Sequence, residues 1–196
     1  MNFCSHCGER VSRRIPDGDD RHRHVCSGCG RIHYQNPKIV VGTIPQWHGK
    51  ILLCLRAIEP RYGMWTLPAG FLENDETVEA GAIRETREEA GIGVDLPVLF
   101  AVFDLTFVHQ VYMMWRVDMI SERVDPGAES LEAVLFDEAD IPWDRLAFPV
   151  IRKTLECYFE DRRNGRFRLH TGRIQRLQQA DLAAMPPHPS GRQSNG

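Results

Sequence analysis

Residues 70–92 read GFLENDETVEAGAIRETREEAGI, and this stretch decides the fold of the chain around it. A helix advances by about 100° per residue, so Glu85, Glu88 and Glu89 fall within about one third of its circumference. An adjacent stripe carries the residues that we expect to pack, namely Val78, Ala82, Ile83, Thr86 and Ala90. We therefore predict a loop followed by a helix, with a packing face next to a carboxylate face.

The predicted helix carries its own boundary signals. Asp75 or Thr77 can accept hydrogen bonds from the free amide groups at its start. Gly91 suits the left-handed backbone conformation that often follows the last residue of a helix. The element is therefore consistent with its local sequence.

Acidic side chains dominate this segment. Seven acids stand against Arg84 and Arg87 between Glu73 and Glu89, which gives a formal charge of −5. Carboxylates on one helix face repel one another, so something must compensate their charge. Mg2+ and Mn2+ bind carboxylate, carbonyl and water oxygens and share them with substrate phosphates. A metal site is one interpretation, and a solvated acidic helix face is the other.

The complete spacing favours the metal site. It runs G-x5-E-x7-R-E-x2-E-E-x-G from Gly70 to Gly91, and it resembles the signature of the Nudix hydrolases at every fixed polar and glycine position. Thr86 stands where an aliphatic residue is common, and residues 65–69 (WTLPA) also resemble the family. The resemblance implies an α/β fold, the Nudix α/β/α sandwich, and pyrophosphohydrolase activity.

The resemblance also assigns roles within the signature. The implied ligands of Mg2+ or Mn2+ are Glu85, Glu88, Glu89 and the carbonyl oxygen of Gly70. Arg84 would form an ion pair with Glu76 that holds the loop against the helix. The implied reaction is attack of water on one phosphorus of a nucleoside diphosphate linked to another group, assisted by bound cations.

Other candidate site residues lie outside the helix. Nudix enzymes often recruit a further glutamate as the base, and Glu129 and Glu132 are the candidates, with Glu132 preferred. An ordinary exposed acid is the alternative for both. Arg56 and Arg61 are candidate phosphate contacts, and Phe71 could stack a substrate ring, although packing explains most of the aromatic residues equally well.

Four cysteines near the start form a second pattern. Cys4, Cys7, Cys26 and Cys29 are spaced C-x2-C-x18-C-x2-C, which suits a tetrahedral zinc site. Two disulfides or a redox pair are the alternatives. Fewer than forty residues cannot bury much core, so we expect this zinc ribbon to depend on its metal for folding.

The charge of the ribbon argues against a nucleic-acid partner. Residues 1–38 carry seven basic and four acidic side chains, a formal +3. Four thiolates with one Zn2+ reduce this to about +1, a poor match to a phosphate backbone. We expect a structural ribbon or one that forms a homodimer.

Length and composition indicate one enzyme domain with an accessory module. The chain has 196 residues, 42% hydrophobic content and a net charge of −3. We predict a zinc ribbon (1–37), a Nudix domain (38–162) and a basic C-terminal extension (163–196) that ends in a flexible tail. Predicted strands cover 38–45, 50–56, 94–107, 110–120 and 133–136, and a closing helix covers 148–162. No apolar run approaches a membrane span and the start lacks a signal-peptide region, so we expect a cytoplasmic protein with no membrane partner.

The identity of the diphosphate is the remaining question. Ribbon-bearing NADH pyrophosphatases carry a Ser-Gln-Pro-Trp-Pro-Phe-Pro-type motif after the signature, and residues 100–117 (FAVFDLTFVHQVYMMWRV) lack it. Over most of residues 3–160 the chain is more similar to plant ADP-ribose/FAD pyrophosphatases, for example in RIHYQNPKIVVG and PGAESLE. That similarity implies cleavage of ADP-ribose to AMP and ribose 5-phosphate, or of FAD to AMP and FMN. An NADH pyrophosphatase and a non-catalytic nucleotide sensor are the alternatives.

Overall fold

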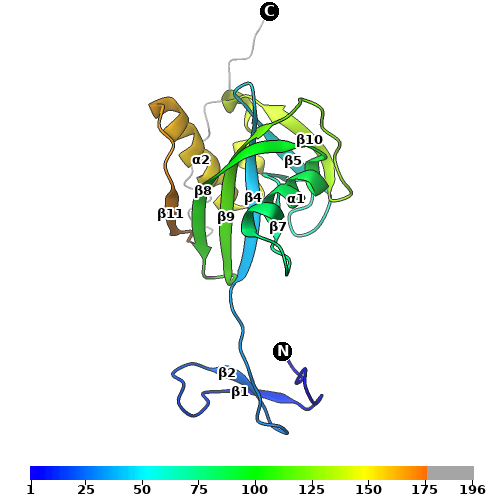
Figure 1. Cartoon of the computed structure of the whole chain (residues 1–196), viewed down its shortest axis with the longest axis vertical. Coiled ribbons are helices and arrows are strands. Elements are labelled where there is room, and N and C mark those ends of the chain that lie inside the picture. The colour runs from blue at the N-terminus through cyan, green and yellow to red at the C-terminus, as the bar shows by residue number, and fades with distance from the viewer. Residues whose placement is uncertain (176–196) are drawn as a thin grey trace, which may run out of the picture. The chain divides into compact units, whose positions relative to one another are not determined.

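The computed structural model describes residues 1–175, which form two compact units, Met1–Pro37 and the part that begins at Lys38 (Figure 1). The elements of the first unit are β1 (Val11–Arg14), β2 (Arg23–Cys26) and β3 (Ile32–His33). Those of the second unit are β4 (Lys38–Trp47), β5 (Lys50–Arg56), β6 (Trp65–Thr66), β7 (Ala69–Phe71), α1 (Val78–Ala90), β8 (Val94–Leu105), β9 (Gln110–Met119), β10 (Ser130–Phe136), the 3-10 helices Glu138–Asp140 and Trp143–Arg145, α2 (Pro149–Asn164) and β11 (His170–Arg173). No helix within residues 1–175 is long and apolar enough to cross a membrane.

The first unit is an antiparallel sheet with the order β1-β2-β3 and two similar turns. The Gly8 amide donates to the Cys4 carbonyl at 3.0 Å, and the Gly30 amide donates to the Cys26 carbonyl at 3.2 Å. Both glycines have positive φ, 78° and 72°, a conformation that costs glycine little. The two turns therefore present both cysteine pairs in the same way.

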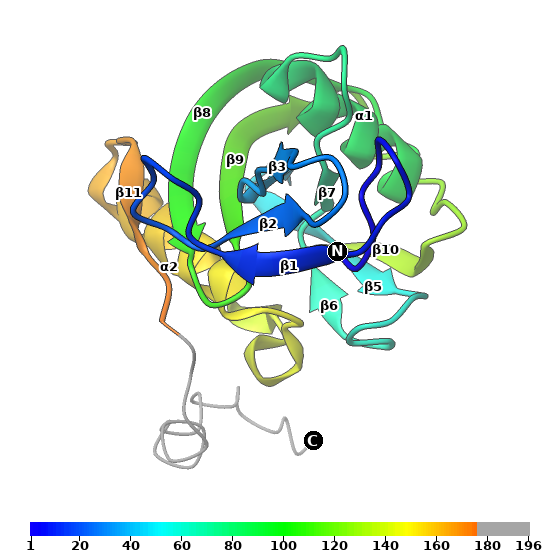
Figure 2. The ribbon, with the colours of Figure 1, turned by 90° about the horizontal axis from the view of Figure 1, so that it is seen from below.

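The second unit is built on one mixed sheet with the strand order β10-β5-β4-β9-β8-β11, to which β6 and β7 add at β5 and β4. The pairs β4–β9 and β8–β11 are parallel, and the other pairs are antiparallel. The long strands β8 and β9 are visibly curved (Figure 2).

The two helices cover opposite faces of this sheet. Successive residues of a strand point to opposite sides. Val41 of β4 packs with Ala82 of α1, whereas its neighbour Val40 belongs to the larger core that contains Leu155 and Tyr158 of α2. The predicted α/β/α sandwich is therefore confirmed.

Local signals at α1 act as the sequence predicts. The Thr77 side chain accepts a hydrogen bond from the Ala80 amide at 3.1 Å, so Thr77 rather than Asp75 caps the helix. Gly91 follows the helix with φ 65°. Thr86 is fully buried and its hydroxyl lies 2.6 Å from that of Thr43 on β4, a polar contact where an aliphatic pair would be expected.

Several boundaries differ from the expected ones. β8 ends at Leu105 and β10 begins at Ser130, because pairing with β9 and β5 sets their ends. β11 pairs with β8, so the sheet continues into the segment expected to be a C-terminal extension. The expected flexible tail, 184–196, lies outside the described residues.

Asp161 near the end of α2 connects the helix to β11. Its Oδ2 accepts the Arg168 amide at 2.9 Å and lies 2.8 Å from His170 Nε2, and Asp161 is only 2% exposed. Burial acts to raise the pKa of Asp161, but the Arg168 amide and the His170 imidazole outweigh it and hold the pKa below its ordinary value. The carboxylate thus stabilises the fold in its charged form.

Replacing Asp161 should destabilise the second unit in a pH-dependent way. We expect Asp161→Asn to lower the free energy of unfolding by about 1–3 kcal/mol near neutral pH, because a charge-assisted acceptor is lost. A depressed folded-state pKa stabilises above the unfolded value of about 3.9, and this contribution is lost as pH falls through the folded pKa. In urea unfolding from neutral pH down to about pH 3, the difference in free energy of unfolding between the wild type and Asp161→Asn should therefore shrink. Asp144→Asn, at an exposed position, is the control; equal losses in both variants would contradict the assignment.

Candidate active site

A cavity of about 730 Å3 lies in the second unit, where α1 meets the ends of several strands. Glu85, Glu88 and Glu89 of α1 line it together with Arg84. Its apolar and aromatic lining comes from β4, β8, β9, the β8–β9 turn and the start of α2, namely Val40, Leu105, Phe107, Val108, Tyr112 and Phe148. One cavity therefore combines a carboxylate cluster with surfaces that suit a flat organic ring.

Gly70 lies directly against Glu85. Gly70 pairs with Val41 in the β4–β7 ladder, which fixes its backbone. A Cβ atom added at Gly70 would overlap the Glu85 carboxylate group, so no other residue fits without a shift. The contact brings the peptide group of Gly70 and the carboxylate of Glu85 together, as a shared metal site requires.

Arg84 joins the loop to the helix as predicted. Its Nε and Nη2 atoms donate to both carboxylate oxygens of Glu76, at 3.0 and 2.8 Å, and Nη2 also donates to the Phe71 carbonyl at 3.1 Å. These hydrogen bonds lower the pKa of Glu76 to about 2. The loop between β7 and α1 is thereby tied to the helix.

The same guanidinium also contacts the carboxylate cluster. Arg84 Nη1 lies 2.8 Å from Glu85 Oε1 and 2.9 Å from Glu88 Oε2. Within residues 1–175, the four cysteines form the one set of three or more potential metal ligands that is already gathered. Glu85 and Glu88 instead converge on one cationic nitrogen, Arg84 Nη1.

Glu89 is the most buried of the three glutamates. It is 6% exposed, and its Oε2 accepts the Ala69 amide at 3.1 Å. Burial raises its pKa to about 8, and the nearby charges of Glu85 and Glu129 add to the effect. Burial likewise raises the pKa of Glu85. A divalent cation would favour the charged form of both groups.

The two candidate bases occupy different surroundings. Glu129 lines the cavity, and its charge is close enough to raise the pKa values of Glu85 and Glu89 further, after burial. Glu132 lies on β10 opposite Leu55, is exposed, and is not among the residues that line the cavity. The arrangement favours Glu129 over the glutamate that the sequence preferred.

The candidate substrate contacts differ in whether they line the cavity. Arg56 lines the cavity, is 9% exposed, donates from Nε to the Pro60 carbonyl at 3.0 Å, and lies over the Phe148 ring at 5.2 Å. Arg61 is exposed and is not among the lining residues. Phe71 lines the cavity and is 45% exposed, and Lys38 Nζ lies over its ring, 4.7 Å from the centroid.

Several lining residues were not candidates from the sequence, among them Phe107, Val108 and Phe148. Phe107 and Val108 lie in the turn between β8 and β9 and are exposed, and Phe148 caps the start of α2. The available signal was the pair of large apolar residues in a turn. Exposed apolar side chains of this kind often mark a binding site.

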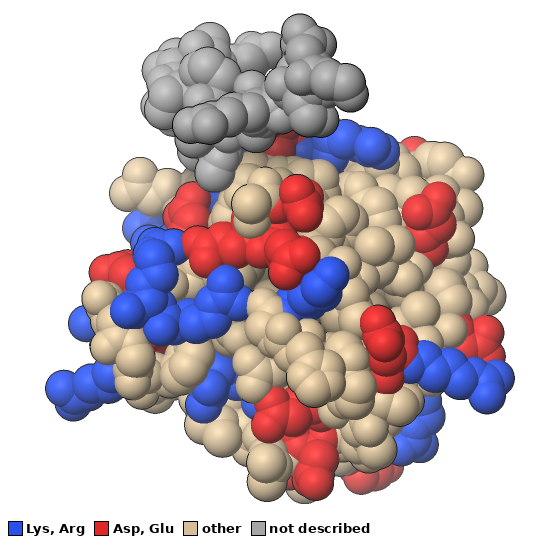
Figure 3. Space-filling view, turned by 90° about the horizontal axis from the view of Figure 1, so that it is seen from above, with Lys and Arg blue, Asp and Glu red and all other residues tan. Residues whose placement is uncertain are grey.

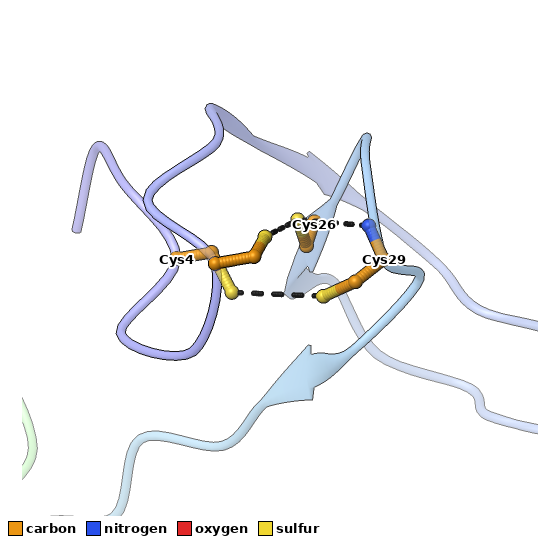
Figure 4. Close-up of side chains that lie close together, drawn as sticks. Cys4, Cys26 and Cys29 are labelled. Carbon is orange, nitrogen blue, oxygen red and sulfur yellow. Dashed lines mark hydrogen bonds between the residues drawn. The ribbon is translucent and has the colours of Figure 1, made fainter.

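In the first unit, the four cysteine sulfurs lie within 4.8 Å of one another. Figure 4 shows the sulfur atoms of Cys4 and Cys29 facing each other, 3.8 Å apart, and Cys7 and Cys26 are 3.4 Å apart. The Cys29 amide lies 3.3 Å from Cys26 Sγ, and the His6 amide lies 3.4 Å from Cys4 Sγ. The set fits one tetrahedral ion. His33 Nε2 also lies 3.2 Å from Cys4 Sγ, beside the cluster.

Arginines near the end of α2 do not form an unpaired basic patch. Arg162 and Arg163 both pair with Glu138, and Arg168 lies 3.7 Å from Asp161. Figure 3 shows basic and acidic side chains next to each other on the face of the molecule seen from above. These arginines therefore form ion pairs within the chain.

Comparison with known proteins agrees with this geometry. The family model described as NUDIX domain matches residues 37–155, and the zinc-ribbon model described as Nudix N-terminal matches residues 2–35. A crystal structure of a NUDIX hydrolase from Nitrosomonas europaea is 50% identical, with a TM-score of 0.86, and covers 90% of this chain and 100% of that chain.

Two curated relatives have more specific names. The ADP-ribose pyrophosphatase of Methanocaldococcus jannaschii is 33% identical over 145 residues, 72% of this chain and 80% of the relative. The NAD-capped RNA hydrolase NudC of Photobacterium profundum is 32% identical over 147 residues, 72% of this chain but only 52% of the relative. The chain thus spans about half the length of that relative. With a family model that covers more than half of its residues and the signature glutamates gathered in one cavity, this chain belongs to the Nudix hydrolase family.

Proposed function

We propose that this Nudix hydrolase cleaves the diphosphate of ADP-ribose and of FAD, releasing AMP together with ribose 5-phosphate or FMN. The observation that carries the proposal is the single cavity that contains the α1 carboxylates, the buried Arg56 and an aromatic lining. Such a cavity suits a ligand with a diphosphate and a flat ring. The name of the M. jannaschii relative supports ADP-ribose, whereas FAD rests on the sequence resemblance to plant ADP-ribose/FAD pyrophosphatases.

The proposed binding site for Mg2+ or Mn2+ consists of Glu85, Glu88, Glu89 and the Gly70 carbonyl oxygen. When bound, the cation supplies charge neutralisation at the phosphoryl oxygens and a lowered pKa for water. With a cation bound, Arg84 Nη1 would leave Glu85 and Glu88, while its Nε and Nη2 would stay on Glu76. The arginine thereby keeps the loop in place as the carboxylates exchange partners.

The other proposed roles follow from the lining of the cavity. Glu129 accepts the proton of the attacking water, whose oxygen bonds to one phosphorus. The bond from that phosphorus to the bridging oxygen breaks, and the bridging oxygen leaves with the second phosphate. Arg56 binds the charge of a phosphate, and Phe71 stacks a ring of the substrate. Water is the only co-reactant.

NADH is the second candidate substrate, because the zinc ribbon before the Nudix domain also resembles the NADH pyrophosphatases. Relatives named NAD-capped RNA hydrolase NudC match this chain about as well as the ADP-ribose pyrophosphatase does. A nucleotide sensor without turnover is a further alternative. The retention of every acidic residue of the signature argues against the sensor, since binding alone does not require three crowded carboxylates.

We also propose that Cys4, Cys7, Cys26 and Cys29 hold one structural Zn2+. The four thiolates complete the coordination and leave no position for a substrate. The ribbon has little buried core of its own, so the metal would supply most of its folding free energy.

A substrate panel tests the proposed activity. With Mg2+ or Mn2+, we expect AMP release from ADP-ribose and FAD to exceed that from NADH. Glu88→Gln should lower turnover by more than about 100-fold, because a metal ligand is lost. Preferential NADH cleavage would favour the second candidate, and nucleotide binding without metal-dependent AMP release would favour the sensor.

Matched glutamate variants test the base. We expect Glu129→Gln to lower kcat by roughly 10^2–10^4-fold with little change in the metal concentration for half-maximal activity, because a proton acceptor is lost. Glu132→Gln, three residues away on the same strand region, should have nearly wild-type kcat. The reverse result would assign the base to Glu132.

Zinc removal tests the ribbon. Elemental analysis of freshly purified protein should find one zinc per chain, and Cys26→Ser should abolish it. Without zinc, amide resonances of the ribbon should collapse to unfolded positions, while those of α1 and α2 stay in place, because the second unit has its own core. Protein without zinc but with a folded ribbon would contradict the assignment.

A further inference from the structure

We infer that Gly127 is a positioning residue, because the docking of residues 125–127 onto the end of α1 sets the place of Glu129 in the cavity. The inference rests on the proposed function, in which Glu129 is the base. It concerns how the fold holds a group that comes from outside the signature helix.

Hydrogen bonds attach this loop to the C-terminal end of α1. The Asp125 amide donates to the Ala90 carbonyl at 2.9 Å, and the Gly127 amide donates to the Glu89 carbonyl at 3.2 Å. The last carbonyls of a helix have no partner within the helix, so the loop supplies donors that α1 itself lacks. The attachment therefore stabilises both elements.

Two glycines allow the close approach. A Cβ atom at Gly127 would overlap the backbone carbonyl oxygen of Glu88, and one at Gly91 would overlap the carbonyl oxygen of Asp125. In both cases the obstacle is backbone, which cannot move aside as the end of a flexible side chain can. Any larger residue at Gly127 must push the loop away from α1.

The backbone of Glu129 is fixed by two further hydrogen bonds. The Ser130 amide donates to the Gly127 carbonyl at 3.0 Å, which closes a turn that contains Glu129. The Ala57 amide donates to the Glu129 carbonyl at 2.8 Å, just beyond the end of β5. Glu129 is thus held between the sheet and the loop, and a displacement at Gly127 is transmitted to it across one intervening residue.

The helix residues that receive the loop are also members of the carboxylate cluster. The backbone of Glu88 and Glu89 contacts Gly127, while their side chains line the cavity with Glu129. The loop therefore fixes the position of Glu129 relative to the proposed metal ligands. A misplacement of about 1 Å at a reacting group can cost on the order of 10^2-fold in rate.

The test compares Gly127→Ala, Glu129→Gln and the double variant in the full-length protein. We expect Gly127→Ala to lower kcat for ADP-ribose by about 10–100-fold, with KM and the Mn2+ concentration for half-maximal activity unchanged. The double variant should be no slower than Glu129→Gln, because both changes remove the same contribution. Gly172→Ala is the control, since a Cβ atom there meets nothing within 4 Å.

Two results would overturn the inference. Multiplicative losses in the double variant would show that Gly127 does not act through Glu129, and a shifted Mn2+ requirement would show that it acts through α1. If Gly127→Ala does not fold, amide exchange of the wild-type protein decides: slow exchange at Asp125 and Gly127 is expected, and exchange as fast as in an open loop would contradict the docking. If the wild type hydrolyses none of the substrates, the proposed function is refuted. The docking of residues 125–127 can then still be measured by amide exchange.

Discussion

Repulsion between carboxylates on a single stretch of α1 is the constraint around which the catalytic unit is arranged. Glu85 and Glu88 share the Nη1 atom of Arg84, whose other nitrogens bind Glu76. Glu89 is buried and accepts a backbone amide instead. Each acid therefore has a compensating partner, but only part of the charge is neutralised. In the proposed function, a divalent cation would compensate the charge that Arg84 leaves on this cluster.

The sheet gives this helix a fixed support. β4 pairs with β7, which carries Gly70, and contacts α1 through Val41 and Thr43. The opposite face of the same strand packs on α2, so the helix that carries the acids rests on the central layer of the sandwich. The substrate cavity opens where this layer ends, which explains why acidic, cationic and aromatic residues from distant parts of the sequence meet there.

Features decided within a few residues could be predicted from the sequence. The limits of α1 and the Glu76–Arg84 ion pair depend on short-range geometry, and the structure reproduces them. β11, and the position of Glu129 relative to Glu132, depend on hydrogen bonds between segments far apart in the chain. The strand pattern of the PGAESLEAVLF region gave no means to tell which glutamate faces the cavity. The sequence also gave no sign that the β8–β9 turn lines the same cavity as α1, because turns carry no periodicity.

We propose that Glu85, Glu88 and Glu89 bind a divalent cation and that Arg84 Nη1 makes way for it. The sharpest test of this binding mode is a crystal structure with Mn2+ and a non-hydrolysable ADP-ribose analogue. Anomalous diffraction data would locate the Mn2+ ion. The account predicts an anomalous peak in contact with Glu85, Glu88 and Glu89, with Arg84 still bound to Glu76 but released from the other two acids. A structure with substrate analogue in the cavity, no such peak, and Arg84 still between Glu85 and Glu88 would contradict it.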